Sequence, residues 1–292
     1  MITDNKTNFL YLANSLQQKF PDFYSILSGI LKDCNIDFSL LPNTKDVWPV
    51  DYMPVQVNSN RYVQFVYNPD YLRMSQKWQK TISNVDAICD EIGISREHSN
   101  IILDGGNVIK NEGTVIMCDK VFRENPCIDR AELIIQLHEL FEVEKLVFIP
   151  QDPEDFTGHA DGMVRFIDDK TVIVNNYLKD YRPLFQKEFR ASLKKAGLEY
   201  IELTYGPDET STESAKGLYI NFLEIGNTII VPTFGIHDLS NRWGIKDECA
   251  DDECAVTLLE HLFQGHNIKV LDCNEIAPHG GLLNCISWKI KK

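Results

Sequence analysis

Cys285 is the residue of this chain best suited to covalent chemistry, because it follows the pair Gly280-Gly281 in a terminal segment that also holds a histidine. Glycine lacks Cβ and tolerates positive φ, so a thiol beside such a pair can reach a pocket. A lone cysteine near a strand is nevertheless more often a buried, unreactive core residue. For Cys285 to act as a nucleophile, other parts of the chain must therefore supply a base, an acid that orients the base, and groups that bind the substrate.

A base is available in the segment Thr157-Gly158-His159-Ala160-Asp161-Gly162. Residues two apart in an extended chain point to the same face, so we expect the imidazole and the carboxylate to lie side by side. A cysteine, a histidine and an acid that orients the histidine form the arrangement of an activated nucleophile.

Two further acids lie close to strand ends. Asp51 stands between Trp48 and Pro54, and Asp104 precedes Gly105-Gly106 directly after an apolar strand. Carboxylates oppose the ionisation of a nearby thiol, so their presence makes sense where the substrate is itself a cation. A planar guanidinium matches carboxylates bidentately, and its positive charge would stabilise the thiolate at the moment of attack.

The composition limits the classes of function. The chain has 292 residues, 43% of them hydrophobic, which allows one large domain or two, and no boundary stands out, so we expect a single domain over 1–292. A net charge of −14 disfavours nucleic acid as a partner. No apolar run approaches the roughly 20 residues that span a bilayer. The N-terminus lacks the pattern of a secretory signal, so we expect a cytoplasmic protein with no membrane contact. A homodimer is left open.

The eight cysteines are scattered, and we expect all of them to be reduced. No CxxC pair occurs, and Cys249 and Cys254 have no matching Cys or His pair elsewhere. The sequence therefore predicts no zinc site.

The elements that must position these residues recur as a strand hairpin, a helix and a strand, about five times along the chain. Helices are expected from Pro21 and over 77–92, 129–141, 184–196 and 249–262, with hairpins over 108–117, 163–174 and 218–231 and a last strand over 282–290. We expect Asp129 to cap its helix and Gly197 to end the next one. Asn221, inside an apolar run, needs hydrogen-bond partners if it is buried.

The motifs Trp48-x-x-Asp51-x-x-Pro54, Asp104-Gly105-Gly106-Asn107, Gly158-His159-x-Asp161 and Gly280-Gly281-x-x-x-Cys285 occur in this order. Together they resemble the guanidine-modifying enzymes, and most closely the family of agmatine deiminases and Porphyromonas-type peptidylarginine deiminases. The resemblance covers about 46–287 and departs from the family pattern at Val50, Asp104 and Asn284. It implies the pentein fold, an α/β propeller of five ββαβ-type units around a pseudo-fivefold axis, which agrees with the recurrence above.

The resemblance also implies roles. Cys285 would attack the guanidinium carbon, and His159 would protonate departing ammonia and then activate water. Asp51 and Asp161 would grip the guanidinium nitrogens, with Trp48 also at the substrate. Asp104, where the family usually has Glu, would bind substrate or steady the histidine. The intermediate would be a thiouronium, the product a ureido compound, and no metal or organic cofactor is implied.

The leading hypothesis is an amidine hydrolase for a small cationic guanidino compound, with agmatine first and free or peptidyl arginine next. An amidinotransferase, which passes the amidino group to an amine, is the alternative within enzymes. A non-catalytic scaffold that binds a guanidinium is the alternative outside them, and the presence of both Cys285 and His159 argues against it.

Overall fold

The computed structural model describes residues 1–73, 75–177, 181–207, 211, 213–235 and 252–292. The strands of this part of the chain form five three-stranded sheets. In each sheet the middle strand pairs antiparallel with one neighbour and parallel with the other. An antiparallel pair needs only a tight turn, whereas a parallel pair needs a crossover, so each sheet with its crossover forms one ββαβ unit.

The sheets, in spatial order of their strands, are β15 (Ser287–Ile290), β1 (Phe9–Ala13) and β2 (Asp37–Leu41); β3 (Val55–Asn58), β4 (Arg61–Val66) and β5 (Glu97–Ile102); β6 (Ile109–Lys110), β7 (Thr114–Cys118) and β8 (Lys145–Ile149); β9 (Val164–Phe166), β10 (Thr171–Asn175) and β11 (Glu199–Leu203); and β12 (Leu223–Ile225), β13 (Thr228–Thr233) and β14 (Asn267–Asp272).

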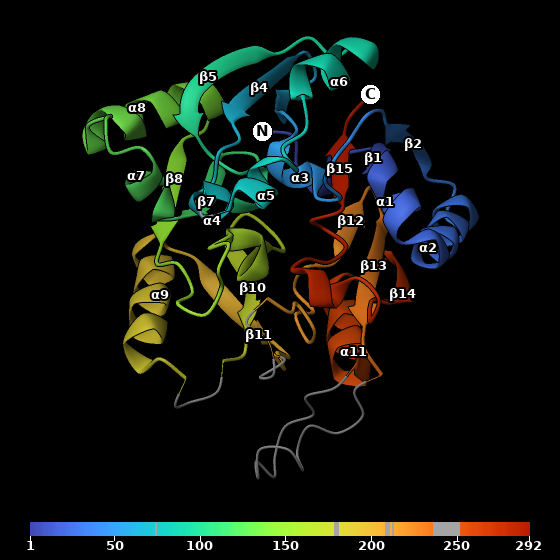
Figure 1. The fold of residues 1–292 in the computed structure, drawn as a ribbon. Helices are drawn as coiled ribbons and strands as arrows, with labels where there is room; N and C mark the ends of the chain where they lie inside the picture. The colour runs from blue at the N-terminus through green and yellow to red at the C-terminus, as the bar shows by residue number, and fades with distance from the viewer. Residues whose placement is uncertain (74, 178–180, 208–210, 212, 236–251) are drawn as a thin grey trace.

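The longer helices of the crossovers lie on the outside of the molecule (Figure 1). The described crossovers contain helices of different lengths. These helices are α1 (Asn14–Lys19) and α2 (Pro21–Asp33); α4 (Asp70–Arg73), α5 (Gln76–Gln79) and α6 (Val85–Glu91); α7 (Lys120–Glu124) and α8 (Arg130–Phe141); α9 (Pro183–Lys195); and α11 (Asp252–Leu262). Figure 1 shows the five units following one another around a common centre. No helix in the described ranges is long and apolar enough to cross a membrane.

The ring closes by pairing the two ends of the chain. β15 completes the first sheet by lying antiparallel to β1, with Phe9 opposite Ile290 and Leu12 opposite Ser287. The buried apolar residues lie largely between neighbouring units, and the largest cluster joins β1 and α2 to the last unit, for example Leu12 and Leu27 to Ile230 and Leu283. Each unit therefore depends on the next for its core.

Local sequence signals account for several element ends. Pro21 is the first residue of α2, where its missing N–H costs nothing. The Asp129 side chain accepts hydrogen bonds from the backbone N–H groups of Ala131 and Glu132, which confirms the predicted cap of α8. Gly197 follows α9 with φ of +70°, as predicted for a glycine that ends a helix.

Four local predictions were wrong. The expected helix over 77–92 is two helices, because Asn84 caps α6 from within the stretch. The strand expected from 218 begins only at Leu223, and the strand expected from 282 begins only at Ser287, because both preceding stretches fold into turns. Cys254 is disulfide-bonded, so the expectation that all cysteines are reduced was wrong at this position. Cys249, and the predicted helical residues 249–251, lie outside the described residues.

Candidate active site

Each of the four sequence motifs, and Asn221 in the remaining unit, occupies the same place, the connection that leads into the first strand of its unit. Asp51 lies in α3 (Pro49–Tyr52) before β3, Asp104 precedes the 3-10 helix η2 (Gly105–Asn107) before β6, and Asp161 lies in η3 (Ala160–Gly162) before β9. Asn221 precedes β12 and Cys285 precedes β15. Because the first strands come from five units arranged around one centre, these connections meet there although they are far apart in sequence.

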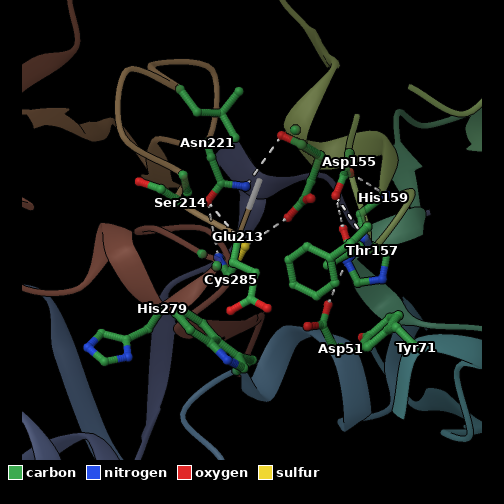
Figure 2. Close-up of a pocket in the computed structure, with 18 of the residues that line it drawn as sticks. Asp51, Tyr71, Asp155, Thr157, His159, Glu213, Ser214, Asn221, His279 and Cys285 are labelled. Atoms are coloured by element: carbon green, nitrogen blue, oxygen red, sulfur yellow. Dashed lines mark hydrogen bonds and ion pairs between the residues drawn. The ribbon is translucent and has the colours of Figure 1, made fainter. Parts of the chain in front are cut away.

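The meeting point is a cavity of about 390 Å³. Its lining includes Trp48, Asp51, His159, Asp161 and Cys285, which is every predicted site residue except Asp104. In Figure 2, Cys285 and His159 approach the pocket from opposite sides, with Asp51 on the same side as the histidine. The structure therefore brings the predicted residues together.

The Cys285 thiol lies against polar groups of two other connections. Its Sγ is 3.5 Å from Asp161 Oδ2 and 3.4 Å from Asn221 Oδ1, and only 8% of the residue is exposed. Burial and the charges of Asp161 and Asp51 raise the pKa of Cys285 well above its usual value. The thiol is therefore protonated in the free site.

Asn221 explains why the apolar run before Cys285 is not a strand. Its Oδ1 accepts hydrogen bonds from the backbone N–H groups of Asn284 and Cys285, at 3.1 and 3.3 Å. These N–H groups are thereby withdrawn from a β-ladder and the segment is held in turns. The sequence indicated only that a buried Asn221 needs partners; the structure identifies them as the nucleophile segment.

His159 is held between two carboxylates that come from other units. Its Nε2 is 2.8 Å from Asp104 Oδ2, and its Nδ1 is 3.5 Å from Asp51 Oδ1. Burial opposes the charged imidazolium, but Asp51 and Asp104 outweigh it and raise the pKa of His159 to about 9. The ring edge packs against Tyr71, with ring centroids 6.0 Å apart. The imidazole is thus fixed in place and charged at neutral pH.

The prediction that His159 and Asp161 point to one face of an extended segment was wrong. Residues 160–162 form a turn of 3-10 helix, which rotates Asp161 away from the imidazole. Its carboxylate instead accepts a hydrogen bond from Asn284 Nδ2 at 2.8 Å and faces the thiol. The acids that contact His159 are Asp104 and Asp51.

Asp104 lies behind the histidine, fully buried, and is paired with a lysine that the sequence gave no reason to select. Lys120, 1% exposed, places Nζ 3.0 Å from Asp104 Oδ2 and 2.6 Å from the carbonyl oxygen of Thr157. Burial alone would raise the pKa of Asp104, but Lys120 and His159 lower it. Asp104 therefore remains ionised, and its shorter side chain still reaches the imidazole.

Two glycines permit close approaches in the site. The N–H of Gly106 donates to Asp51 Oδ1 at 3.1 Å, and a Cβ at this position would lie 2.5 Å from that oxygen and 2.7 Å from His159 Nδ1. A Cβ at Gly281 would lie 2.5 Å from the Trp48 ring. The glycine pair near Cys285 thus serves to seat Trp48 against the wall of the cavity.

Asp51 is the site carboxylate that burial drives toward its neutral form. Burial raises its pKa to about 8; the charge of His159 lowers the pKa, whereas those of Asp161 and Asp104 raise it further. At neutral pH Asp51 is therefore mostly protonated in the free site, and a cation bound against it would favour its carboxylate form. The site is suited to a buried planar cation. Among the described residues no group of His, Cys, Asp and Glu side chains has the arrangement of a metal site.

The ring of five ββαβ units with its site in the connecting segments is the pentein fold, which the sequence predicted. The sequence profile of a family described as Porphyromonas-type peptidyl-arginine deiminase matches residues 14–290. The chain belongs to this family, and the resemblance inferred from the motifs is confirmed.

Individual relatives agree with this assignment. A Vibrio parahaemolyticus protein provisionally named agmatine deiminase is 22% identical over 284 residues, covering 84% of this chain and 75% of its own. The agmatine deiminase of Pseudomonas fluorescens is 21% identical over 221 residues, covering 64% of this chain, which spans only 56% of that protein. The structure of C. jejuni agmatine deiminase matches all of this chain and 95% of that one, with a TM-score of 0.79 and 19% identity.

Proposed function

We propose that this protein is an amidine hydrolase, a deiminase that replaces one guanidinium nitrogen by oxygen, acting as a single domain over residues 1–292. The observation that carries the proposal is the position of the Cys285 thiol and the His159 imidazolium on opposite sides of one cavity whose walls also hold Asp51 and Asp161. Membership of the family and the fold support it.

Guanidinium binding would activate the nucleophile. Asp51 and Asp161 accept hydrogen bonds from the guanidinium nitrogens, and the added positive charge compensates the burial and the acids that keep the Cys285 thiol protonated. As this charge arrives the thiol gives its proton to bulk water, and the thiolate sulfur forms a bond to the guanidinium carbon.

His159 then moves protons in two directions. As an imidazolium it donates a proton to the departing nitrogen, so the C–N bond breaks, ammonia leaves and a thiouronium remains on Cys285. The neutral imidazole next takes a proton from water, the oxygen attacks the same carbon, and the C–S bond breaks. The products are a ureido compound and the thiolate, which takes up the proton of the added hydroxyl and returns to the thiol of the free site. Asp104, held by Lys120, keeps the ring oriented through both steps.

The far part of the cavity supports agmatine as the first substrate. Besides Asp51 and Asp161, the described part of the lining carries five more acids but only two lysines, Lys19 and Lys216, and no arginine. These acids are Asp46, Asp152, Glu154, Asp155 and Glu213. Such a surface favours a substrate whose second end is an amine over one that ends in a carboxylate. Free or peptidyl arginine follows agmatine, and the same surface disfavours the carboxylate of free arginine.

The test is turnover of agmatine, arginine and a blocked arginine peptide, measuring ammonia and the ureido product separately. We expect agmatine to be converted, Cys285→Ala to abolish conversion, and Cys127→Ala, at an exposed cysteine outside the cavity lining, to leave it intact. The proposal is overturned if neither the wild type nor Cys285→Ala converts any compound of a broad panel of guanidino compounds. If the amidino group is transferred to an added amine, and no ureido product forms when the amine is left out, the protein is an amidinotransferase and not a hydrolase.

A further inference from the structure

A second set of polar side chains lies behind the site segments, on the inner strands. The first strand of each unit contributes one such residue to a smaller cavity of about 100 Å³. They are Gln56 of β3, Lys110 of β6, Arg165 of β9, Glu224 of β12 and Lys289 of β15. Asn284 lines this cavity, whereas the next residue, Cys285, lines the active site. The nucleophile segment therefore separates the two cavities.

The first strands of the units bring more positive than negative side chains to this smaller cavity, and the N-terminal segment supplies a counter-ion. Asp4, in η1 (Asp4–Lys6), places Oδ2 2.6 Å from Lys289 Nζ and 3.0 Å from an Arg165 nitrogen. Lys110 Nζ is farther away, 3.9 Å from the other oxygen of Asp4. Asp4 thus fixes where the Lys289 ammonium lies.

Lys289 connects this cluster to the active site through a single amide. Its Nζ donates to Asn284 Oδ1 at 2.8 Å, and Asn284 Nδ2 donates to Asp161 Oδ2 at 2.8 Å. An ammonium only donates and a carboxylate only accepts, so together they allow one orientation of the amide. The same Oδ2 lies 3.5 Å from Cys285 Sγ.

We propose that Lys289 is a positioning residue for substrate binding, which acts through Asn284 to hold the Asp161 carboxylate in the geometry that grips the guanidinium. The proposal rests on the function proposed above and deepens it. Lys289, Asn284 and Asp161 form a hydrogen-bonded relay, and all three are well buried: Asp161 is 2% exposed, Asn284 5% and Lys289 7%. Water therefore does not readily replace a missing partner.

Removing the ammonium leaves Asn284 Oδ1 without the donor that anchors it. Asp161 still favours Nδ2 on its side, but the side chain that holds the Asp161 carboxylate is then no longer held itself. A hydrogen bond to a charged group typically corresponds to about tenfold to a hundredfold in an equilibrium constant. We expect Lys289→Met to raise KM for agmatine about tenfold or more, with kcat changed less than about threefold, because Asp161 holds the guanidinium in the ground state and the transition state alike.

Three further variants separate the relay from general stability. Asn284→Asp is isosteric and puts an oxygen against Asp161, so it should raise KM at least as much as Lys289→Met. Lys289→Arg retains a donor, has room in the adjoining cavity, and should restore most of the affinity. Lys110→Met removes a charge from the same cluster but not from Asn284, and should leave KM unchanged. A role confined to stability would lower the melting temperature in all of these variants without moving KM.

The same loss is measurable without turnover, by calorimetric titration of agmatine into Cys285→Ser protein with and without Lys289→Met. The expected result is binding that weakens about tenfold in the double variant. The inference is overturned if folded Lys289→Met protein binds agmatine like its parent, or if Lys110→Met weakens binding equally. Failure of the deiminase proposal is distinct, because there the wild type forms no ureido product while the binding comparison still reports on the relay.

Discussion

Replacing Asp161 by asparagine should change two reactivities of Cys285 in opposite directions. The carboxylate lies 3.5 Å from Sγ, and both groups are buried. At an effective dielectric constant of 20, the repulsion between a thiolate and a carboxylate at this distance is about 5 kcal/mol. Even half of that corresponds to roughly a fiftyfold change in the thiolate population. Asp161→Asn should therefore make the thiol more reactive toward a neutral electrophile and less active on a cationic substrate.

The assay compares 2-chloroacetamide with 2-chloroacetamidine, which have nearly the same shape and differ in charge. The wild type should react faster with the cationic amidine, because its charge offsets those of Asp161 and Asp51. In Asp161→Asn the rate with the neutral amide should rise at least about tenfold, and kcat/KM for agmatine should fall about a hundredfold or more. Asp37→Asn, at an exposed position of β2, is the matched control and should leave both rates unchanged.

Parallel loss of both reactivities in Asp161→Asn would refute this account, because it would mean that Asp161 activates the thiol directly. An unchanged rate with the neutral amide would show that the carboxylate charge does not reach the sulfur. The first result would change the role of Asp161 from binding the substrate to assisting the nucleophile. The second would leave it as a substrate-binding residue without an effect on the thiol.

The geometry supports two further predictions. Gly106→Ala should lower kcat at least about a hundredfold, because its Cβ collides with Asp51 and His159, whereas Gly29→Ala, in the middle of α2 with nothing near its Cβ, should be active and more stable by about 0.5–1 kcal/mol; turnover and thermal unfolding check both. Stability should also fall as the pH rises from about 6.5 to about 9. The raised pKa of His159, about 9, stabilises the folded state fully below the unfolded value of about 6.5, and this contribution is lost as the pH passes the folded pKa. The raised pKa of Asp51, about 8, acts in the same direction, so a melting temperature that rises over this range would contradict the assignment of both groups.

Much of the architecture could be predicted because it depends on local patterns. The apolar spacing of Phe23, Leu27 and Leu31 marks the buried face of α2, and turn residues mark the hairpins. The fivefold recurrence of a hairpin, a helix and a strand was visible in the sequence and is present in the five sheets. Cys285, His159, Asp51 and Asp161, which were proposed from the sequence as one site, all line the same cavity.

What could not be predicted depends on partners from distant units. Apolar spacing alone cannot show that the Asn221 side chain takes the N–H groups of the nucleophile segment, so that segment was expected to be a strand. The pairing of His159 with Asp104 joins two connections 55 residues apart, so only the family resemblance suggested it, whereas spacing alone pointed to the sequence neighbour Asp161. Lys120 and Lys289 resemble surface lysines in sequence, because only the ring places a carboxylate or an amide opposite each of them.

Closure of the ring by β15 has a consequence for how the protein is made. During synthesis β1 emerges before its partner β15, which follows every other described strand of the ring. Cys285 directly precedes this partner, so the thiol reaches the histidine only after the two ends have met. Long-range pairing of this kind is slow to form and leaves an unpaired strand edge exposed in the meantime. A nascent chain therefore passes through a stage that carries its acids and its base but no nucleophile, and its catalytic chemistry begins only when the last strand is in place.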